Sequence, residues 1–171
     1  MSQEEKKAEE KKPDEPKAEE KKPEEKKSAE PVDPTKTHEA AKWKHTRPLT
    51  ACRIDPTGKY AFTGAEDNVV VRWDLATGAA ASLEAHDSWV RAIGFSPAAD
   101  TVYSGGYDGR LIWWPAAAEK PEPIRKIEPA HQGWIRALAV SPDGTRIATC
   151  GNDKLVKVWD TADGRLVARC R

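Results

Sequence analysis

The stretch SGGYDGRLIWWP, residues 104–115, decides the fold because variants of it occur three times along the chain. The other copies are TGAEDNVVVRWD at 63–74 and TCGNDKLVKVWD at 149–160. Each copy begins with serine or threonine, has an aspartate four positions later and places a tryptophan ten positions after the hydroxyl residue. Spacing that recurs about every 40 residues is the signature of a repeat architecture.

A histidine lies 18 residues before each of these copies. The three are His45, His86 and His131, which are 41 and 45 residues apart. Apolar residues follow the histidines in a shared register, for example Leu49, Val90 and Ile135. These runs predict short strands that are buried on both sides. Cys52 occupies one of the apolar positions, so we expect it to be a small core residue.

Turn residues separate the predicted strands of each repeat. DPTG at 55–58 and SPDG at 141–144 have the pattern of a type I turn, whereas SPAA at 96–99 lacks the glycine. Small residues with Asp or Asn form a second tight reversal before the strand that ends in tryptophan. A fourth apolar stretch follows each tryptophan. The sequence therefore predicts an all-β chain with four antiparallel strands in each repeat.

This combination resembles the WD-repeat β-propeller family over residues 45–171. The resemblance implies three four-stranded antiparallel blades, at approximately 45–85, 86–130 and 131–171, in an incomplete ring, since propellers have four to eight blades. The sequence departs from the family where Lys44 precedes the first histidine in place of glycine, and where Pro115 replaces aspartate. The segment AAAEKPEP, 116–123, lengthens one loop.

The resemblance also implies a buried hydrogen-bond chain in each blade, running from the tryptophan indole through the hydroxyl and the histidine to the aspartate. The three predicted tetrads are His45, Thr63, Asp67 and Trp73; His86, Ser104, Asp108 and Trp114; and His131, Thr149, Asp153 and Trp159. Serine, histidine and aspartate also make catalytic triads, but a hydrolase needs one exposed nucleophile beside an oxyanion hole. Here the set occurs three times without a Gly-x-Ser-x-Gly motif, so we expect no catalytic residue and no enzyme.

Residues beside the tetrads are candidates for partner binding. In this family, the loop before the first strand and the turn between the second and third strands open on one rim. The residues at these positions are Trp89, Arg91, Tyr107, Trp134, Arg136 and Asn152. Tryptophan, tyrosine and arginine are enriched at the energetic centres of interfaces. The alternative is that both tryptophans only pack over neighbouring loops, with the arginines stacked on them or paired with acids.

Neither a metal site nor a cofactor is expected. The tetrad histidines belong to separate blades, His38 lies outside the repeats, and no two histidines or cysteines have ligand spacing. Cys52, Cys150 and Cys170 form no Cys-x-x-Cys pair, which favours reduced thiols.

Residues 1–44 differ in composition from the repeats. They carry 12 lysines and 13 acidic residues with few apolar ones, so we interpret them as a disordered, low-complexity Glu/Lys/Pro-rich arm. Because the charges balance, neither nucleic acid nor membrane is an expected partner. No signal peptide and no run of 18 apolar residues is present, which predicts a cytoplasmic protein.

The sequence thus predicts a non-catalytic scaffold or adaptor that binds a protein or peptide through the Trp/Arg-rich rim. The alternatives are a regulatory or sensor fragment of a larger protein and a truncated, non-functional remnant. Three blades leave a ring open, so further blades or self-association are expected to close it. Residues 38–44, with Trp43, are a candidate outer strand for a last blade.

Overall fold

The computed structural model describes residues 33–171, so most of the arm predicted for residues 1–44 lies outside the described residues. The described residues divide between two compact units, with the boundary after Ala40. In the first unit, the short 3₁₀ helix η1, Pro34–Lys36, begins after Asp33, whose carboxylate accepts the backbone N–H of Thr35 at 3.0 Å. The second unit, Ala41–Arg171, contains all the strands.

Three antiparallel sheets of four strands make up the second unit, and we call them blades 1, 2 and 3. Each blade is a meander in which consecutive strands pair. The strands are β1 Leu49–Ile54, β2 Tyr60–Ala65, β3 Val69–Asp74, β4 Ala80–Glu84, β5 Val90–Phe95, β6 Thr101–Gly106, β7 Leu111–Pro115, β8 Arg125–Ile127, β9 Ile135–Val140, β10 Arg146–Gly151, β11 Val156–Asp160 and β12 Leu166–Cys170. This arrangement confirms the predicted fold class of three four-stranded blades.

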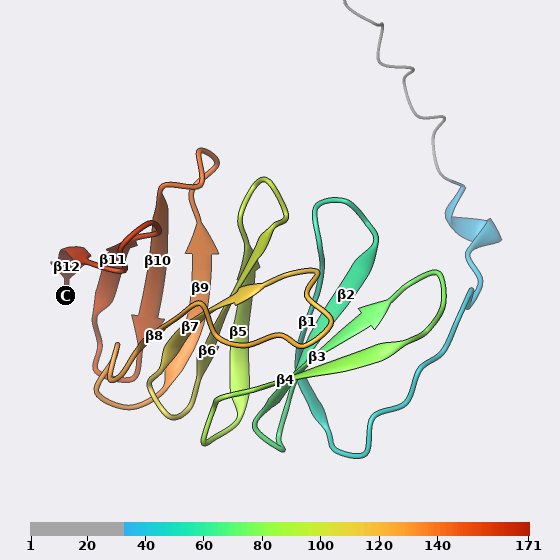
Figure 1. The fold of residues 1–171 in the computed structure, drawn as a ribbon, viewed down its shortest axis with the longest axis horizontal. Coiled ribbons are helices and arrows are strands. Elements are labelled where there is room, and N and C mark those ends of the chain that lie inside the picture. Colours follow the sequence, from blue (N-terminus) through green and yellow to red (C-terminus); the bar gives the residue numbers. More distant parts are fainter. Residues whose placement is uncertain (1–32) are drawn as a thin grey trace, which may run out of the picture. The chain divides into compact units, whose positions relative to one another are not determined.

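The blades stand side by side in chain order, and in the described residues they do not close a ring (Figure 1). Strand β5 contacts β1 on one side and β9 on the other. The first strand of each blade is therefore its inner strand, and β4, β8 and β12 lie at the outer edges of the sheets.

Each joint between blades is built from the same repeat positions. At the first joint, Phe62 and Val70 of blade 1 share a fully buried cluster with Val102 and Trp114 of blade 2. The second joint repeats this pattern with the corresponding residues of blades 2 and 3: Tyr103, Leu111, Ile147 and Trp159. Because these buried residues come from both blades at each joint, the joints supply the principal cores of the fold.

Glycine in the second strand lets successive blades approach closely. A Cβ on Gly64 would overlap the carbonyl oxygen of Val90, and one on Gly105 would lie 2.7 Å from Cγ2 of Ile135. Blade 3 has Cys150 at the matching position, where no described blade packs against it. The two glycines therefore serve the joints and not the turns.

The open side of blade 1 is only partly covered. The ring of Trp43 stacks on that of Trp73, with centroids 6.4 Å apart and an interplanar angle of 19°. No strand forms over residues 38–44, so the expected outer strand is wrong, and Trp43 instead acts as a cap on this face. Cys52 is exposed, contrary to the expected core position, because no blade packs against that side of β1.

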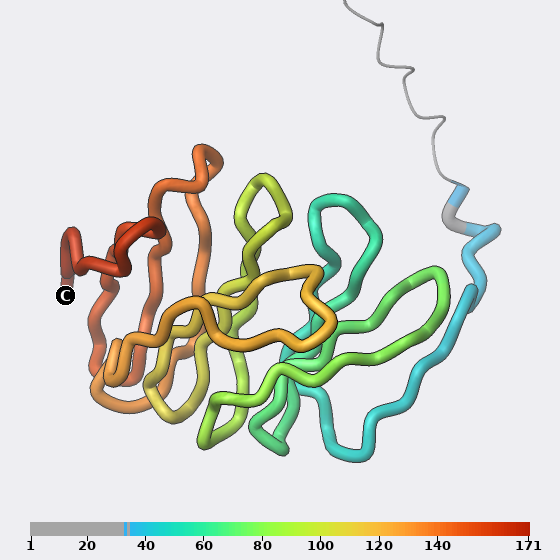
Figure 2. Tube along the Cα trace, in the orientation of Figure 1, coloured from blue at the N-terminus to red at the C-terminus, as the bar shows by residue number. Residues whose placement is uncertain are grey.

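The long loop between β7 and β8 lies alongside blade 1 (Figure 2). Arg72 of β3 donates hydrogen bonds of 2.8 Å to the carbonyl oxygens of Ala116 and Ala118 in this loop. The segment that lengthens the second repeat thus adds a polar connection between blades 1 and 2.

Substituting Gly64 with alanine tests the glycine joint. We expect Gly64→Ala to lower the free energy of unfolding by about 1–3 kcal/mol, because the methyl group forces the first two blades apart. Chemical denaturation measures the change. The matched control is Cys150→Ala, which alters the same position of the last blade and is expected to cost less than about 1 kcal/mol. Equal losses for both variants would contradict the close-packed joint.

Candidate functional site

The tetrad of blade 2 is a continuous chain of hydrogen bonds. The indole N–H of Trp114 donates to Oγ of Ser104 at 2.8 Å, and Nε2 of His86 lies 2.8 Å from the same oxygen. Nδ1 of His86 lies 2.9 Å from Oδ2 of Asp108. In the tautomer that directs Nδ1–H of His86 at the carboxylate, Nε2 accepts a hydrogen bond from the serine hydroxyl, which in turn accepts from the indole N–H.

Blade 3 repeats this chain with threonine in place of serine. Trp159 Nε1 and His131 Nε2 each lie 2.8 Å from Oγ1 of Thr149. His131 Nδ1 lies 2.8 Å from Oδ1 of Asp153. Serine and threonine give the same geometry, so the hydrogen-bond chain depends on where the hydroxyl oxygen lies and not on which of the two residues carries it.

Burial separates this arrangement from a catalytic triad. Ser104 has the hydrogen-bond order of a triad serine, but its exposed fraction is 0%, as is that of Trp114, which donates to it. A nucleophile must reach the substrate carbonyl and lie beside an oxyanion hole. The Ser104 hydroxyl meets no solvent and already has both partners, so its geometry supports a structural role.

Blade 1 contains only part of the predicted tetrad. Trp73 Nε1 donates to Thr63 Oγ1 at 2.9 Å, and His45 presents Nε2 to Oδ2 of Asp67 at 2.8 Å. With Nε2 on the aspartate, the ring is reversed, and no hydrogen bond joins His45 to Thr63 in the described residues. Oδ1 of Asp67 is buried without a partner. The prediction of a third complete tetrad is therefore wrong.

The segment before the histidine explains this difference. Arg110 donates to the carbonyl oxygen of Ala85 at 3.0 Å, and Lys157 donates to that of Ala130 at 2.6 Å. These two carbonyls directly precede the histidines of blades 2 and 3, so each histidine enters its blade in a fixed orientation. Blade 1 has valines, at 69 and 71, at the offsets of the two cationic residues, so it lacks this anchor. The repeat motif did not identify these cationic anchors.

The aspartates of the two complete tetrads, Asp108 and Asp153, remain ionised acceptors at neutral pH. Burial alone raises the pKa of Asp153, but hydrogen bonds from His131 and from the backbone N–H groups of Leu155 and Gln132 outweigh it and hold the pKa at about 2. The same balance lowers the pKa of Asp108, where burial is again opposed by histidine and backbone hydrogen bonds.

The predicted rim residues of blades 2 and 3 form one aromatic stack. Tyr107 lies between two tryptophans: its ring centroid is 5.8 Å from that of Trp89 and 4.4 Å from that of Trp134, with an interplanar angle of 7° in the second pair. The guanidinium of Arg136 lies 4.9 Å from the centroid of Trp134 and donates to Oδ1 of Asn152 at 3.1 Å. We call these five residues the rim stack.

Backbone hydrogen bonds fix the loops that carry the rim stack. The N–H of Tyr107 donates to the carbonyl of Trp89, and the N–H of Asn152 donates to that of Trp134, both at 2.8 Å. Even so, 41% of Trp89 and 42% of Trp134 are exposed. The sixth predicted residue, Arg91, is not in the stack: it donates to the carbonyl of Thr50 in blade 1 at 3.3 Å.

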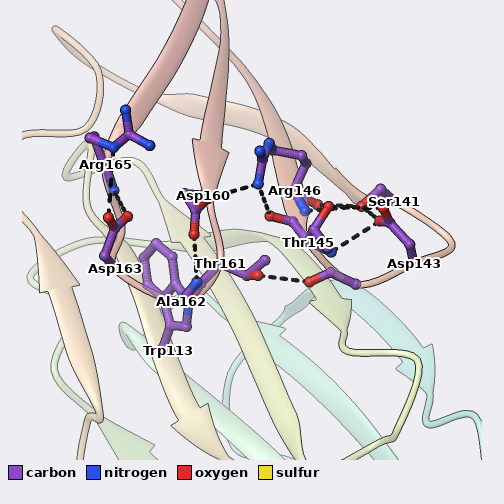
Figure 3. A network of polar contacts seen from close by, with 11 residues as sticks. Trp113, Ser141, Asp143, Thr145, Arg146, Asp160, Thr161, Ala162, Asp163 and Arg165 are labelled. Carbon is purple, nitrogen blue, oxygen red and sulfur yellow. Dashed lines mark hydrogen bonds and ion pairs between the residues drawn. The ribbon is translucent and has the colours of Figure 1, made fainter.

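Polar side chains at the hairpin turns of blade 3 form a second network (Figure 3). Arg146 contacts Asp160 at 2.7 Å, and the indole of Trp113 in blade 2 donates to the carbonyl of Thr161 at 3.1 Å. Hydrogen bonds from Ser141 and Thr145 lower the pKa of Asp143 to about 2. These groups satisfy one another, so we assign the network to folding.

In residues 33–171, no three His, Cys, Asp or Glu side chains gather in a group that could hold a metal ion. The same residues include no helix long and apolar enough to cross a membrane. All three cysteines are free.

Alanine substitution of the histidines distinguishes the complete tetrad from the partial one. We expect His86→Ala to cost about 3 kcal/mol of stability, because it leaves Ser104 and Asp108 buried without their partner. His45→Ala serves as the matched control and is expected to cost about 1 kcal/mol, since it removes a single, partly exposed hydrogen bond. Chemical denaturation provides the comparison, and equal losses would count against the incomplete tetrad.

Comparison with known proteins extends over most of the blades. The family described as "WD domain, G-beta repeat" matches residues 38–74, 79–115 and 121–160. The chain is 33% identical over 78 residues to mitotic checkpoint protein bub-3 of Caenorhabditis elegans, covering 46% of this chain and 22% of that protein. It is 27% identical over 84 residues to nuclear distribution protein PAC1 of Arthroderma otae, covering 47% of this chain and 18% of that protein.

A solved structure, that of U3-55K, has the same fold, with a TM-score of 0.69 at 19% sequence identity. The similarity covers 75% of this chain and 40% of U3-55K, so the chain spans well under half the length of these relatives. Since the family's repeat pattern matches three stretches that together exceed half of the sequence, this chain belongs to the WD-repeat family.

Proposed function

We propose that this chain is a non-catalytic interaction module whose rim stack binds a peptide or protein partner. The observation that carries the proposal is the exposure of both tryptophans in an otherwise ordered stack with Tyr107. Members of this family generally serve as protein-interaction scaffolds, which supports the same function. The cytoplasmic location expected from the sequence stays a prediction.

The rim stack has the physical properties of an interface centre. Trp89, Tyr107 and Trp134 offer continuous aromatic surface, and large aromatic side chains supply much of the binding energy at interfaces. Arg136 and Asn152 add directed polar groups at one end. Since stacking and backbone hydrogen bonds already order the loops, binding costs less conformational entropy than ordering free loops would.

An exposed apolar face of blade 3 favours a second contact, independent of the rim stack. Val156 is 44% exposed, whereas Val70 and Leu111, at the same offset in blades 1 and 2, are fully buried against the following blade. A shallow apolar cavity of about 190 Å³ lies beside it, lined by Ala137, Leu138, Ala139, Ala148, Thr149, Cys150 and Val156. We therefore propose that this face packs against another blade, from a second copy of the chain or from a partner.

The rim proposal is tested by selecting binders from a displayed library of random peptides. We expect selected peptides to lose at least about tenfold in affinity for Trp134→Ala, because the substitution removes one of the two exposed indoles of the aromatic surface. Trp43→Ala is the control, since Trp43 has a similar exposed fraction of 37% but lies on the open side of blade 1. Failure to select any peptide, or equal binding by Trp134→Ala, would contradict the proposal.

Light scattering over a range of concentrations tests the blade 3 face. We expect the average mass of the purified chain to exceed that of a monomer and to fall when Val156→Lys places a charge on the apolar face. Ile124→Lys is the control because Ile124 is also exposed but lies in the loop before β8. A monomer at every concentration, with cooperative unfolding, would rule out self-association through this face.

A further inference from the structure

A groove lies where the inner strands of the three blades meet. Strands β1, β5 and β9 enclose a volume of about 250 Å³. Its lining consists of Thr50, Ala51, Arg53, Arg91, Ala92, Ile93, Arg136, Ala137 and Leu138. Each blade thus contributes one arginine, and no aspartate or glutamate is among the lining residues. We call this site the arginine groove.

The three arginines have no carboxylate partner in the described part of the chain. Arg53 donates to the carbonyl of Cys52, Arg91 to that of Thr50, and Arg136 to the side-chain amide of Asn152. Other arginines of the blades do have acidic partners: Arg110 pairs with Asp87 and Glu128, and Arg146 with Asp160. An anionic group that enters the groove therefore meets three guanidinium groups that have no counter-charge of their own, and its charge is attracted to all three.

The arginine groove is continuous with the rim stack. Arg136 belongs to both, because it lines the groove and also lies over the ring of Trp134. Arg53 stands three residues further along its strand than Thr50, the residue that matches Arg91 and Arg136 in the repeat. At a rise of about 3.3 Å per residue, this places Arg53 about 10 Å deeper along the strand direction. The positive charge therefore extends inward from the aromatic surface.

We infer that the partner segment is an acidic peptide, with an apolar or aromatic residue on the rim stack and carboxylate side chains in the arginine groove. This inference rests on the proposed peptide-binding function and specifies its ligand. Guanidinium groups recognise carboxylates through paired, charge-assisted hydrogen bonds. In an extended segment, carboxylates two positions apart lie about 7 Å from each other, which suits arginines staggered along neighbouring strands.

Charge outside the groove argues for a peptide and against nucleic acid. Residues 45–171 carry 16 basic and 15 acidic side chains, so the repeats have almost no net positive charge to attract a polyanion. Binding a nucleic acid requires many phosphate contacts along the backbone. Three arginines within one small groove match a few carboxylates on a short peptide better than they match the many phosphates of a nucleic acid.

Fluorescence anisotropy with the full chain and labelled probe peptides tests the inference. The acidic probe is a short peptide of glutamate and glycine with one central tryptophan, and its counterparts have glutamine or lysine in place of glutamate. We expect the acidic probe to bind at least about tenfold more tightly than the glutamine probe, and this preference to shrink as salt screens the charges. An oligothymidine probe of equal charge is expected to bind more weakly.

Two variants separate this inference from the rim proposal. Arg53→Gln is expected to lower the affinity for the acidic probe about fivefold or more. The affinity for the glutamine probe is expected to stay unchanged, because Arg53 lies outside the rim stack. Trp134→Ala is expected to lower the affinity for both probes. Arg165→Gln is the control, since Arg165 lies in the distant network of Figure 3 and pairs with Asp163.

The outcomes decide between the two ideas. If Trp134→Ala weakens binding while Arg53→Gln does not, or if the glutamine probe binds as well as the acidic one, the rim proposal survives and the acidic specificity is wrong. Tighter binding of oligothymidine than of the acidic probe, or no binding of the acidic probe, also overturns the inference. Thermal unfolding of each variant checks that the fold is retained.

Discussion

The close approach of each blade to the next is the constraint on which the rest of the structure depends. Gly64 and Gly105 leave room for Val90 and Ile135, and this contact brings the large apolar residues of adjacent blades into one core. The tetrads then fix each blade internally, since their indole, hydroxyl, imidazole and carboxylate groups are buried and mutually satisfied in blades 2 and 3. Packing between blades and polar bonding within them thus have separate roles, carried by different residues of the same repeat.

The functional surfaces arise where the repeat varies. Tetrad positions keep their chemistry in every copy, whereas the positions beside them carry Trp89 and Trp134 in two blades but Pro48 in the first. The rim stack therefore spans blades 2 and 3 only. Its surface needs the joint between them, because Tyr107 of one blade stacks on Trp134 of the next with centroids 4.4 Å apart. A binding surface of this kind exists only once the joint has formed.

The sequence predicted the strands and blades well, because fixed spacing of several residue types leaves little freedom in register. Of its six rim residues, five lie in the rim stack and Arg91 does not, and their stacking order was not predicted, since contacts between blades depend on the geometry of the joint. The reversed ring of His45 could not be predicted from the repeat motif, because its orientation follows from the missing cationic anchor. Arg53 was not predicted as a site residue for a related reason. It stands at a different repeat offset from Arg91 and Arg136, and the three arginines share one groove only because the three inner strands meet there.

The unequal burial of the tryptophans has an optical consequence. Trp114 has no exposed surface and Trp159 has 5%, whereas Trp89 and Trp134 are each about two-fifths exposed. A water-soluble quencher such as iodide reaches the indoles of the rim but not those of the tetrads. Trp43, 37% exposed on the open side of blade 1, is accessible as well. In a Trp43→Phe variant, the chain therefore carries two classes of intrinsic chromophore, one that reports on the integrity of the blades and one that reports on events at the rim.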